Sequence, residues 1–234
     1  MTPPTSRVSW PETHRMVMSH YPPIDLYDDV ADPRDWEALA RAQSRTNPRI
    51  YEEIGDLSLV PVERRLSGEG ASWVMAAFTH VSPLRRSRFS DGTFGVYYAA
   101  DTLETALHEH TFHMARFYSP SRTPVGWRSQ VRQLVGSIDA ELTDLRRPGY
   151  DDILNPDIAT YAVSQSFATK AREGGSNGIV YPSLRNRTGE CFGAFYPDVV
   201  SRPKQADHFR YHWNGTSVDF VQKITGSKAM YRLE

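Results

Sequence analysis

The central part of the chain changes from a strand pattern to a helix pattern within a few residues. A strand is predicted for residues 94–100 (FGVYYAA), because aromatic and branched side chains follow a Ser-Asp-Gly turn. A helix is predicted next, with Asp101 as N-cap and Glu104 as its capping-box partner. Apolar side chains at helical spacing form one stripe, which consists of Leu103, Ala106, Leu107, His110, Met114 and Phe117. We therefore expect a strand, a turn and a helix here.

Strand and helix patterns continue to alternate beyond this unit. Strands are predicted around residues 131–138, 179–181 and 190–195, and a helix is predicted at residues 156–172. Two further strands flank Asn214 and Gly215, a dipeptide typical of β-hairpin turns in which both positions take positive φ. The chain therefore reads as a mixed α+β protein that ends in a hairpin.

The N-terminal segment is interrupted by prolines, which are expected to break any long element. One helix is predicted there, capped by Asp32 and begun by Pro33, with an apolar face that includes Trp36. We expect residues 1–58 to form an accessory region, a helical arm packed on the main domain, with a partner-binding arm as the alternative. Residues 59–234 are expected to form the main domain, including the C-terminal hairpin.

Composition excludes several classes of protein. The 27 basic and 28 acidic residues nearly cancel, so no general attraction to nucleic acid or to an anionic membrane is expected. The single cysteine, Cys191, cannot form an intrachain disulfide, and no stretch of about twenty apolar residues is present. The chain has no apolar run typical of a signal peptide near its first residues, and a cytoplasmic location is expected.

Three chemically different side chains are expected to converge near the strand and helix described first. Arg88 precedes the strand, Tyr98 lies near its end, and Glu109 lies about two turns into the helix on the flank of the apolar stripe. A cation, a phenol and a carboxylate can therefore share one pocket beside the sheet.

Two arginines offer a possible phosphate contact. Arg64 and Arg65 follow a predicted strand that begins at Leu57, and a flexible loop with two glycines comes next. No nucleotide-binding fingerprint of the P-loop or Rossmann type is present. Without further context, a pair of solvated surface charges is the preferred interpretation.

The histidine-rich sequence HEHTFH, which begins at His108, is not expected to bind a metal. The zinc-protease pattern HExxH requires a histidine at position 112, where the chain has Phe112, and no second ligand cluster is recognisable. We interpret His110 as a near-core histidine with its hydrogen bonds satisfied. A metal site on the face shared by His110 and His113 is the alternative.

Two further candidate residues have modest expected roles. Ser183 lacks the GxSxG context of an activated nucleophile, so its hydroxyl is expected to hold a ligand amide or to position a neighbouring carboxylate. A simple turn serine is the alternative. Cys191 lies in an apolar strand, which predicts a buried and inert thiol.

In order and spacing these motifs resemble the RES-domain family, named for an arginine, a glutamate and a serine. The matching segments are Arg65, Arg88-Phe89, Val96 to Tyr98, Ala106 to Glu109, and Gly178 to Ser183. The chain departs from the family wording around Arg88, where Ser-Arg-Phe-Ser replaces Gly-Arg-Trp-Asn, and Arg64 competes with Arg65 for the first arginine. The resemblance spans roughly residues 60 to 200.

The resemblance implies a fold similar to ADP-ribosyltransferase toxins, with two small mixed or antiparallel sheets, flanking helices and, here, a helical N-terminal extension. It implies that NAD is the substrate and that no metal is needed. Arg65 and Arg88 would hold the pyrophosphate, Tyr98 would stack on the nicotinamide, and Ser183 would orient the ligand. Glu109 would carry the chemistry, with Arg88 and Tyr98 beside it.

Members of the family are NAD-degrading toxins of bacterial toxin–antitoxin pairs. The resemblance therefore implies release of nicotinamide, a cognate antitoxin of helix-turn-helix type as partner, and water, phosphate or a protein target as acceptor of ADP-ribose. The alternative is a non-catalytic module that uses the same cleft to bind a nucleotide or an antitoxin segment.

Overall fold

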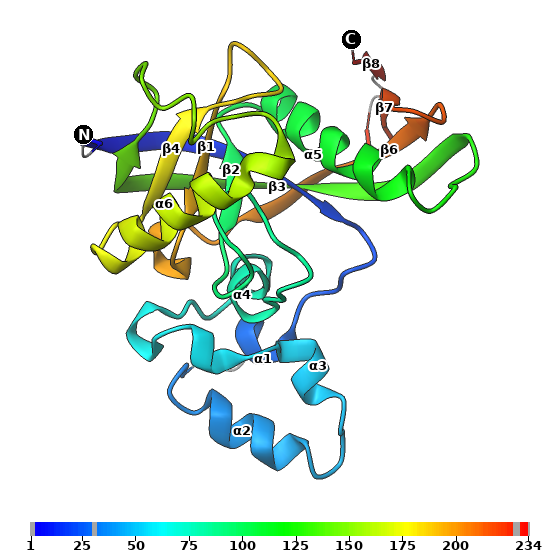
Figure 1. Cartoon of the computed structure of the whole chain (residues 1–234). Coiled ribbons are helices and arrows are strands. Elements are labelled where there is room, and N and C mark those ends of the chain that lie inside the picture. The colour runs from blue at the N-terminus through cyan, green and yellow to red at the C-terminus, as the bar shows by residue number, and fades with distance from the viewer. Residues whose placement is uncertain (1–2, 30–31, 227–229, 234) are drawn as a thin grey trace.

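One mixed sheet of eight strands organises the described part of the chain (Figure 1). The computed structural model describes residues 3–29, 32–226 and 230–233. The strands are β1 (Thr5–Met18), β2 (Tyr97–Ala100), β3 (Gly126–Asp144), β4 (Gly178–Pro182), β5 (Glu190–Ala194), β6 (Lys204–Trp213), β7 (Val218–Lys223) and β8 (Met230–Arg232). The α-helices are α1 (Asp25–Asp28), α2 (Trp36–Gln43), α3 (Ile50–Ile54), α4 (Ala71–Thr79), α5 (Leu103–Tyr118) and α6 (Tyr161–Glu173).

The strand order is β1-β2-β5-β4-β3-β6-β7-β8, and β1 pairs with β3 as well. Hydrogen bonds therefore link β1, β2, β5, β4 and β3 in a closed order, and β6 to β8 extend from β3. The expected mixed α+β class is confirmed, but the expectation of two small sheets is wrong. The reason is the 19-residue length of β3, which lets one strand pair with β1, β4 and β6 and so joins all strands into a single sheet.

The N-terminal segment contributes a long strand to this sheet. β1 runs through 14 residues and includes Pro11, so the expectation that prolines break every long element before residue 58 is wrong. The register with β3 shifts between Trp10 and Thr13, and an irregular position of this kind tolerates a proline without an N–H donor. The sheet thus crosses the predicted boundary at residue 58, whereas α1 to α3 are the helical part of the N-terminal region.

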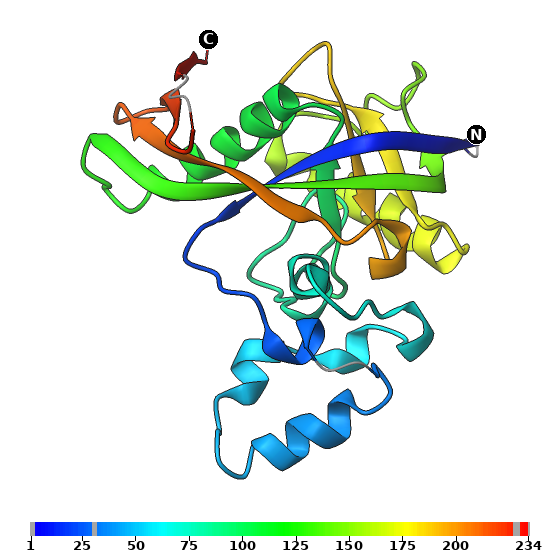
Figure 2. The ribbon, with the colours of Figure 1, turned by 180° about the vertical axis from the view of Figure 1, so that it is seen from behind.

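Helices cover the sheet on two sides. Helices α1 to α4 lie below it in Figure 1, and their buried side chains share a core with one face of β2, β4 and β5. Helices α5 and α6 pack on the other face, and the view from behind shows β1 and β3 in front of them (Figure 2). Among the helices of the described residues, none is long and apolar enough to cross a membrane.

Alternation along the short strands decides which side chains reach the layer of α5 and α6. Successive side chains of a strand point to opposite faces. Val180 and Phe192 therefore belong to the core of α1 to α4, whereas Tyr181 and Cys191 belong to the core of α5 and α6. Tyr98 packs on this second core as well.

Several local predictions hold, with shifted ends. The predicted helix after residue 101 is α5, but Thr102 is its N-cap, because its hydroxyl accepts a hydrogen bond from the N–H of Thr105. The predicted strand from Leu57 is wrong, since Leu57–Leu59 and Val62–Arg64 form short 3-10 helices. The C-terminal hairpin is confirmed as β6 and β7, but four residues connect the strands, and of Asn214 and Gly215 only Gly215 has positive φ.

Candidate functional site

A cavity of about 860 Å³ lies between the sheet, α5 and α6. Arg88, Tyr98 and Glu109 all line it, so the structure brings together the three side chains that the sequence places on different elements. The other charged or titratable groups of its lining are His14, Arg15, Arg86, His110, His113, Arg116, Tyr161, Tyr181 and Cys191. Among the described residues of the lining, Glu109 is the single carboxylate, so the cavity is a cationic site that surrounds one acid.

Helix α5 presents the acid to the cavity because its apolar side faces the core. Ala106, Leu107 and Met114 are buried beneath the helix. Glu109 lies on the flank of this buried stripe and is only partly exposed. The carboxylate is thus held at the cavity wall by the packing of the whole helix.

Ser183 orients this carboxylate. It follows β4 and is buried, with 6% of its surface exposed. Its hydroxyl donates a hydrogen bond of 2.6 Å to Oε1 of Glu109. The same hydroxyl oxygen accepts hydrogen bonds from the N–H groups of Arg185 and Asn186, at 3.2 and 3.0 Å. Because both acceptor positions are filled by backbone donors, the proton of the hydroxyl is directed at the carboxylate.

The loop after Ser183 is fixed against the first turn of α5. The side-chain amide of Asn186 donates to Oγ1 of Thr105, at 3.0 Å. Gly189 closes the loop, and a Cβ at this position would lie 2.0 Å from Oγ1 of Thr105, so only glycine allows this approach. The serine and the glutamate are therefore supported on a rigid common frame.

Tyr98 braces the turn that carries Arg88. The N–H of Phe89 donates to the hydroxyl of Tyr98 at 3.0 Å, and Oγ of Ser87 lies 2.9 Å from the same hydroxyl. The strand partner of Tyr98 is Gly193, whose missing side chain leaves room for the rings of Tyr98 and Phe89. Burial raises the pKa of Tyr98 to about 12, so the hydroxyl stays protonated at neutral pH. The hydroxyl of Tyr98 is thus engaged with the turn, and the residue lines the cavity.

Arg88 is held by neutral groups. Its guanidinium donates to the carbonyl of Asn155 at 2.9 Å and to the hydroxyl of Tyr161 at 3.2 Å, and it lies 4.4 Å from the centre of the Tyr161 ring. Within residues 3–29, 32–226 and 230–233 no carboxylate forms an ion pair with it. With 8% of its surface exposed, Arg88 is a buried cation for which the described residues supply no anion.

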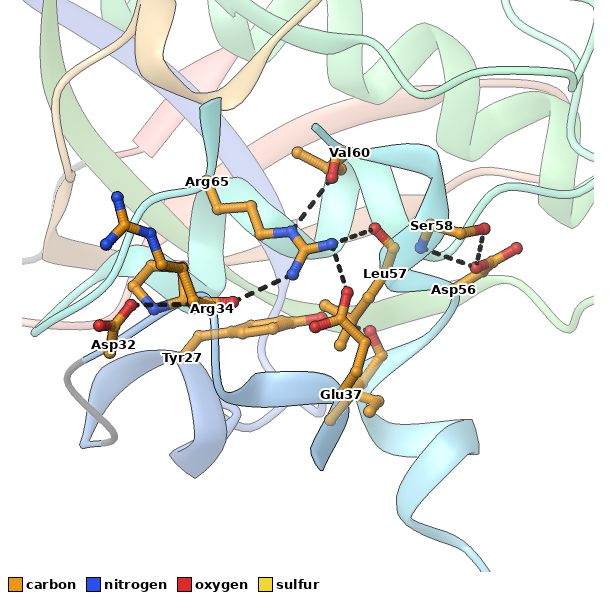
Figure 3. Close-up of polar contacts among 11 residues, drawn as sticks. Tyr27, Asp32, Arg34, Glu37, Asp56, Leu57, Ser58, Val60 and Arg65 are labelled. Atoms are coloured by element: carbon orange, nitrogen blue, oxygen red, sulfur yellow. Dashed lines mark hydrogen bonds and ion pairs between the residues drawn. The ribbon is translucent and has the colours of Figure 1, made fainter. Parts of the chain in front are cut away.

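Arg65 lies away from the cavity and is committed to other contacts (Figure 3). Its guanidinium donates to the carbonyl groups of Val60, Leu57 and Pro33 and pairs with Glu37 at 2.6 Å. The predicted contact of Arg65 with a pyrophosphate is therefore corrected. This arginine ties α2 to the short 3-10 helices, and four of its five N–H donors are engaged in doing so.

Arg64, the alternative first arginine, does not line the cavity either. It pairs with Asp198 at 2.7 Å, donates to Asn177, and stacks over the ring of Tyr196. The interpretation of both arginines as solvated surface charges is also wrong, because each is paired with a carboxylate and packed against the protein.

His110 is neutral and its tautomer is fixed. Its Nδ1 lies 3.0 Å from the hydroxyl of Tyr211, and burial lowers the pKa of His110 to about 3. Burial also raises the pKa of Tyr211, and His110 is the acceptor that the described residues offer to its proton. Tyr211 therefore donates to Nδ1, and the ring proton of His110 lies on Nε2. The prediction of a near-core histidine with its hydrogen bond satisfied is confirmed.

Cys191, the candidate thiol nucleophile, behaves as a core residue. Cys191 is buried, as predicted, and burial raises its thiol pKa well above the usual value. Its sulfur lies 4.0 Å from Oε1 of Glu109. Over the described ranges, no group of three or more His, Cys, Asp or Glu side chains is arranged to hold a metal ion.

Four residues that line the cavity were not predicted from the sequence. Arg15 and His14 come from β1, in the segment expected to be accessory, and Tyr161 and Gln165 come from α6. Spacing could not reveal them, because nothing local links β1 to the strand and helix that carry Tyr98 and Glu109. No local signal distinguishes them either, because β1 and α6 both carry many other polar side chains.

Comparisons with known proteins identify the family to which the chain belongs. The model of the RES domain matches residues 62–214. An uncharacterized protein of Sinorhizobium fredii (strain NBRC 101917 / NGR234), y4oC, is 28% identical over 218 residues, which cover 90% of this chain and 86% of that protein. A chain of the crystal structure of the M. tuberculosis MbcT–MbcA toxin–antitoxin complex aligns over 90% of this chain and 87% of its own length, with 11% identity and a TM-score of 0.42. Because the family model covers more than half of the residues, the protein belongs to the RES domain family.

Proposed function

We propose that this protein is a toxin enzyme that cleaves the N-glycosidic bond of NAD and releases nicotinamide. The observation that carries the proposal is the cavity itself, in which arginines and histidines surround one oriented carboxylate, Glu109. A dinucleotide needs cations for its pyrophosphate, an aromatic wall for its nicotinamide, and a carboxylate near the ribose. All three kinds of group line this cavity, and family membership supports the same substrate.

Arg88 is proposed to bind the pyrophosphate. A guanidinium that is buried without a carboxylate is unfavourable, and a bound phosphate would supply the missing charge. The contacts with Asn155 and Tyr161 orient the guanidinium and leave its charge uncompensated. Arg88 is thus prepared for an anionic ligand.

Tyr98 is proposed to form the wall against which the nicotinamide stacks. Its ring lies beside Phe89, with ring centres 6.3 Å apart and an angle of 21° between planes. Its hydroxyl is engaged with Ser87 and Phe89, which keeps the ring in place. A flat ring held in this way suits a flat pyridinium ring.

Glu109 is proposed to stabilise the charge that develops as the bond breaks. The bond between C1 of the ribose and the pyridinium nitrogen breaks, and its electron pair leaves with nicotinamide. The ribose carbon then carries oxocarbenium character, which a nearby carboxylate stabilises. Ser183 holds Oε1 of Glu109, and Oε2 has no donor among the described residues, so it can act on the ribose. A nucleophile then bonds to C1, and when this is water its proton passes to solvent.

The acceptor of ADP-ribose is proposed to be water, phosphate or a protein side chain. Water would make the protein an NAD glycohydrolase, phosphate an NAD phosphorylase, and a protein target a mono-ADP-ribosyltransferase. An ADP-ribosyltransferase-like core, a cytoplasmic location and a cognate antitoxin of helix-turn-helix type are further parts of the proposal. The core type, the antitoxin and the absence of a metal requirement rest on the family resemblance, whereas the cytoplasmic location rests on the single cysteine. The division into residues 1–58 and 59–234 also stays a proposal.

The test is incubation of the purified protein with NAD, with and without phosphate and cell lysate, followed by mass analysis of the products. Nicotinamide should be released, and Glu109→Gln should lower the rate by at least about a hundredfold at unchanged fold. Glu104→Gln is the matched control, because Glu104 is exposed on the same helix. Binding of NAD without release of nicotinamide would support the non-catalytic module instead. An active Glu109→Gln enzyme would remove the role proposed for this residue.

A further inference from the structure

Arg15 occupies the gap where two strands of the sheet diverge. β1 pairs with β2 at one position, His14 with Ala100. Beyond it, the guanidinium of Arg15 reaches across the gap, donates to the carbonyl of Tyr98 at 2.8 Å, and lies 4.5 Å from the centre of the Tyr97 ring. Arg15 thereby becomes part of the wall of the cavity that holds Glu109.

The charge of Arg15 has no compensation in the described chain. Its Nε atom is buried without a hydrogen-bond partner, and burial lowers its pKa. Its guanidinium contacts a carbonyl and an aromatic ring, and no carboxylate of residues 3–29, 32–226 or 230–233 pairs with it. Arg7 on the same strand and Arg65, by contrast, pair with carboxylates at 2.7 and 2.6 Å. Arg15 is therefore unlike the arginines with structural ion pairs.

Arg88 shares this property and the same cavity. Its contacts are two carbonyl groups, a phenol hydroxyl and an aromatic ring. The one carboxylate of the lining, Glu109, is bonded to Ser183 and pairs with neither arginine. Two uncompensated guanidinium groups from distant parts of the chain therefore face one space. A pyrophosphate diester carries two negative charges and accepts hydrogen bonds from several sides, which is the complement that such a pair requires.

We propose that Arg15 is a second phosphate-binding residue, which together with Arg88 clamps the pyrophosphate of a dinucleotide. The identity of the ligand as a dinucleotide rests on the proposed function. The inference gives the N-terminal strand a direct role in the site, although it lies before the matched residues 62–214. Strand β1 then forms part of the cavity wall, so the N-terminal region contributes to the site directly.

The competing explanation is that Arg15 only braces β2 through the carbonyl of Tyr98. A neutral donor of similar reach, such as glutamine, can make that hydrogen bond but cannot balance a phosphate. The substitution Arg15→Gln therefore separates the two roles. Arg15→Lys keeps the charge, and Arg7→Gln is the matched control on the same strand.

Binding is measured by calorimetry in a Glu109→Gln background, so that NAD is not consumed. Two ligands are compared: NAD, and nicotinamide riboside, which has the same glycosidic bond but no phosphate. Arg15→Gln should weaken NAD binding tenfold or more and leave nicotinamide riboside unchanged, because the lost contact is charge-assisted. Arg15→Lys should restore part of the affinity, and Arg7→Gln should have no effect. Thermal unfolding of the free protein should change little in Arg15→Gln.

Inorganic pyrophosphate provides a measurement that does not depend on NAD. It should bind the parent protein and bind Arg15→Gln at least tenfold more weakly, even if NAD itself proves not to be the ligand. The role of Arg15 would be overturned if the parent and Arg15→Gln bound pyrophosphate with equal affinity. It would also be overturned if Arg15→Gln lost the same affinity for NAD and for nicotinamide riboside. Failure of the parent to bind NAD, with pyrophosphate still bound through Arg15, would instead count against the proposed function.

Discussion

The hydroxyl of Ser183 and the carboxylate of Glu109 form a hydrogen bond of 2.6 Å between residues that are 74 positions apart in the chain. The hydroxyl is itself fixed by the N–H groups of Arg185 and Asn186. One oxygen of the carboxylate is thereby fixed in place. The orientation of the proposed catalytic group thus depends on a residue that needs no contact with substrate.

Substitution of Ser183 by alanine is expected to lower kcat for nicotinamide release by about 10- to 100-fold, the range for a lost hydrogen bond to a charged group. KM should change less, because the serine acts through Glu109. Steady-state kinetics measures both constants. Thr188→Ala is the control in the same loop, since its exposed side chain bonds to the side chain of Asn186. A raised KM at normal kcat would show that Ser183 holds the ligand directly.

The variant Tyr98→Phe keeps the ring but removes the hydroxyl that braces Ser87 and Phe89. We expect a loss of about 1–3 kcal/mol in the free energy of unfolding, because the buried N–H of Phe89 loses its acceptor. The KM for NAD should rise, since Arg88 lies between the two braced residues, whereas kcat should stay near normal. Urea unfolding and steady-state kinetics test both expectations.

The control for this variant is Tyr97→Phe. Tyr97 is the neighbouring residue on β2, and its hydroxyl makes no hydrogen bond with any residue that the structure describes. It should retain the stability of the parent protein. If Tyr98→Phe also kept the stability of the parent protein, the hydrogen bonds of the Tyr98 hydroxyl would not stabilise the fold. The role of Tyr98 would then be that of its ring alone.

Arg65→Met should destabilise the protein by about 3 kcal/mol, because it removes a buried ion pair partner and leaves several carbonyl groups without donors. The folded fraction should bind NAD with normal affinity, since Arg65 does not line the cavity. Arg64→Met provides the comparison. Its side chain and that of Asp198 are 24% and 38% exposed, so the expected loss is below about 1 kcal/mol. A selective loss of NAD binding in Arg65→Met at unchanged stability would contradict this assignment.

Acid should destabilise the fold through His110. Burial lowers the pKa of His110 to about 3 in the folded protein, whereas a histidine in the unfolded chain has a pKa of about 6.5. The unfolded state therefore binds more protons between these values, and the stability contributed by neutral His110 is lost as pH falls from about 6.5 towards 3. His110 contributes at most about 1.4 kcal/mol per pH unit to the slope of the free energy of unfolding against pH.

Urea unfolding at several pH values measures this slope. His110→Gln keeps a group that can hydrogen-bond to Tyr211 but cannot titrate, and it should reduce the dependence on pH in this interval. His20→Gln, at an exposed position, should leave the slope unchanged. An identical slope in the parent and His110→Gln would show that His110 is not a source of acid sensitivity.

The sequence by itself determined the local elements that carry the site. The helical stripe after residue 101, the short strands β4 and β5, and the C-terminal hairpin could all be read from the spacing of apolar side chains. These features depend on neighbours within a few residues, which is the range that a periodic pattern records. Tyr98 and Glu109 were identifiable for the same reason, because one strand, one turn and one helix fix their relative positions.

Only the tertiary structure decided which distant side chains join Tyr98 and Glu109 in the cavity. Arg65 looked like a phosphate ligand, but packing turns it towards Glu37, whereas Arg15 looked like part of an arm, but strand pairing brings it to the cavity. The physical reason is that the pairing of β1 with β3 and the close approach of α2 to the 3-10 helices join segments far apart in the sequence. Local spacing carries no information about such contacts. These contacts nevertheless decide which charged side chains line the cavity.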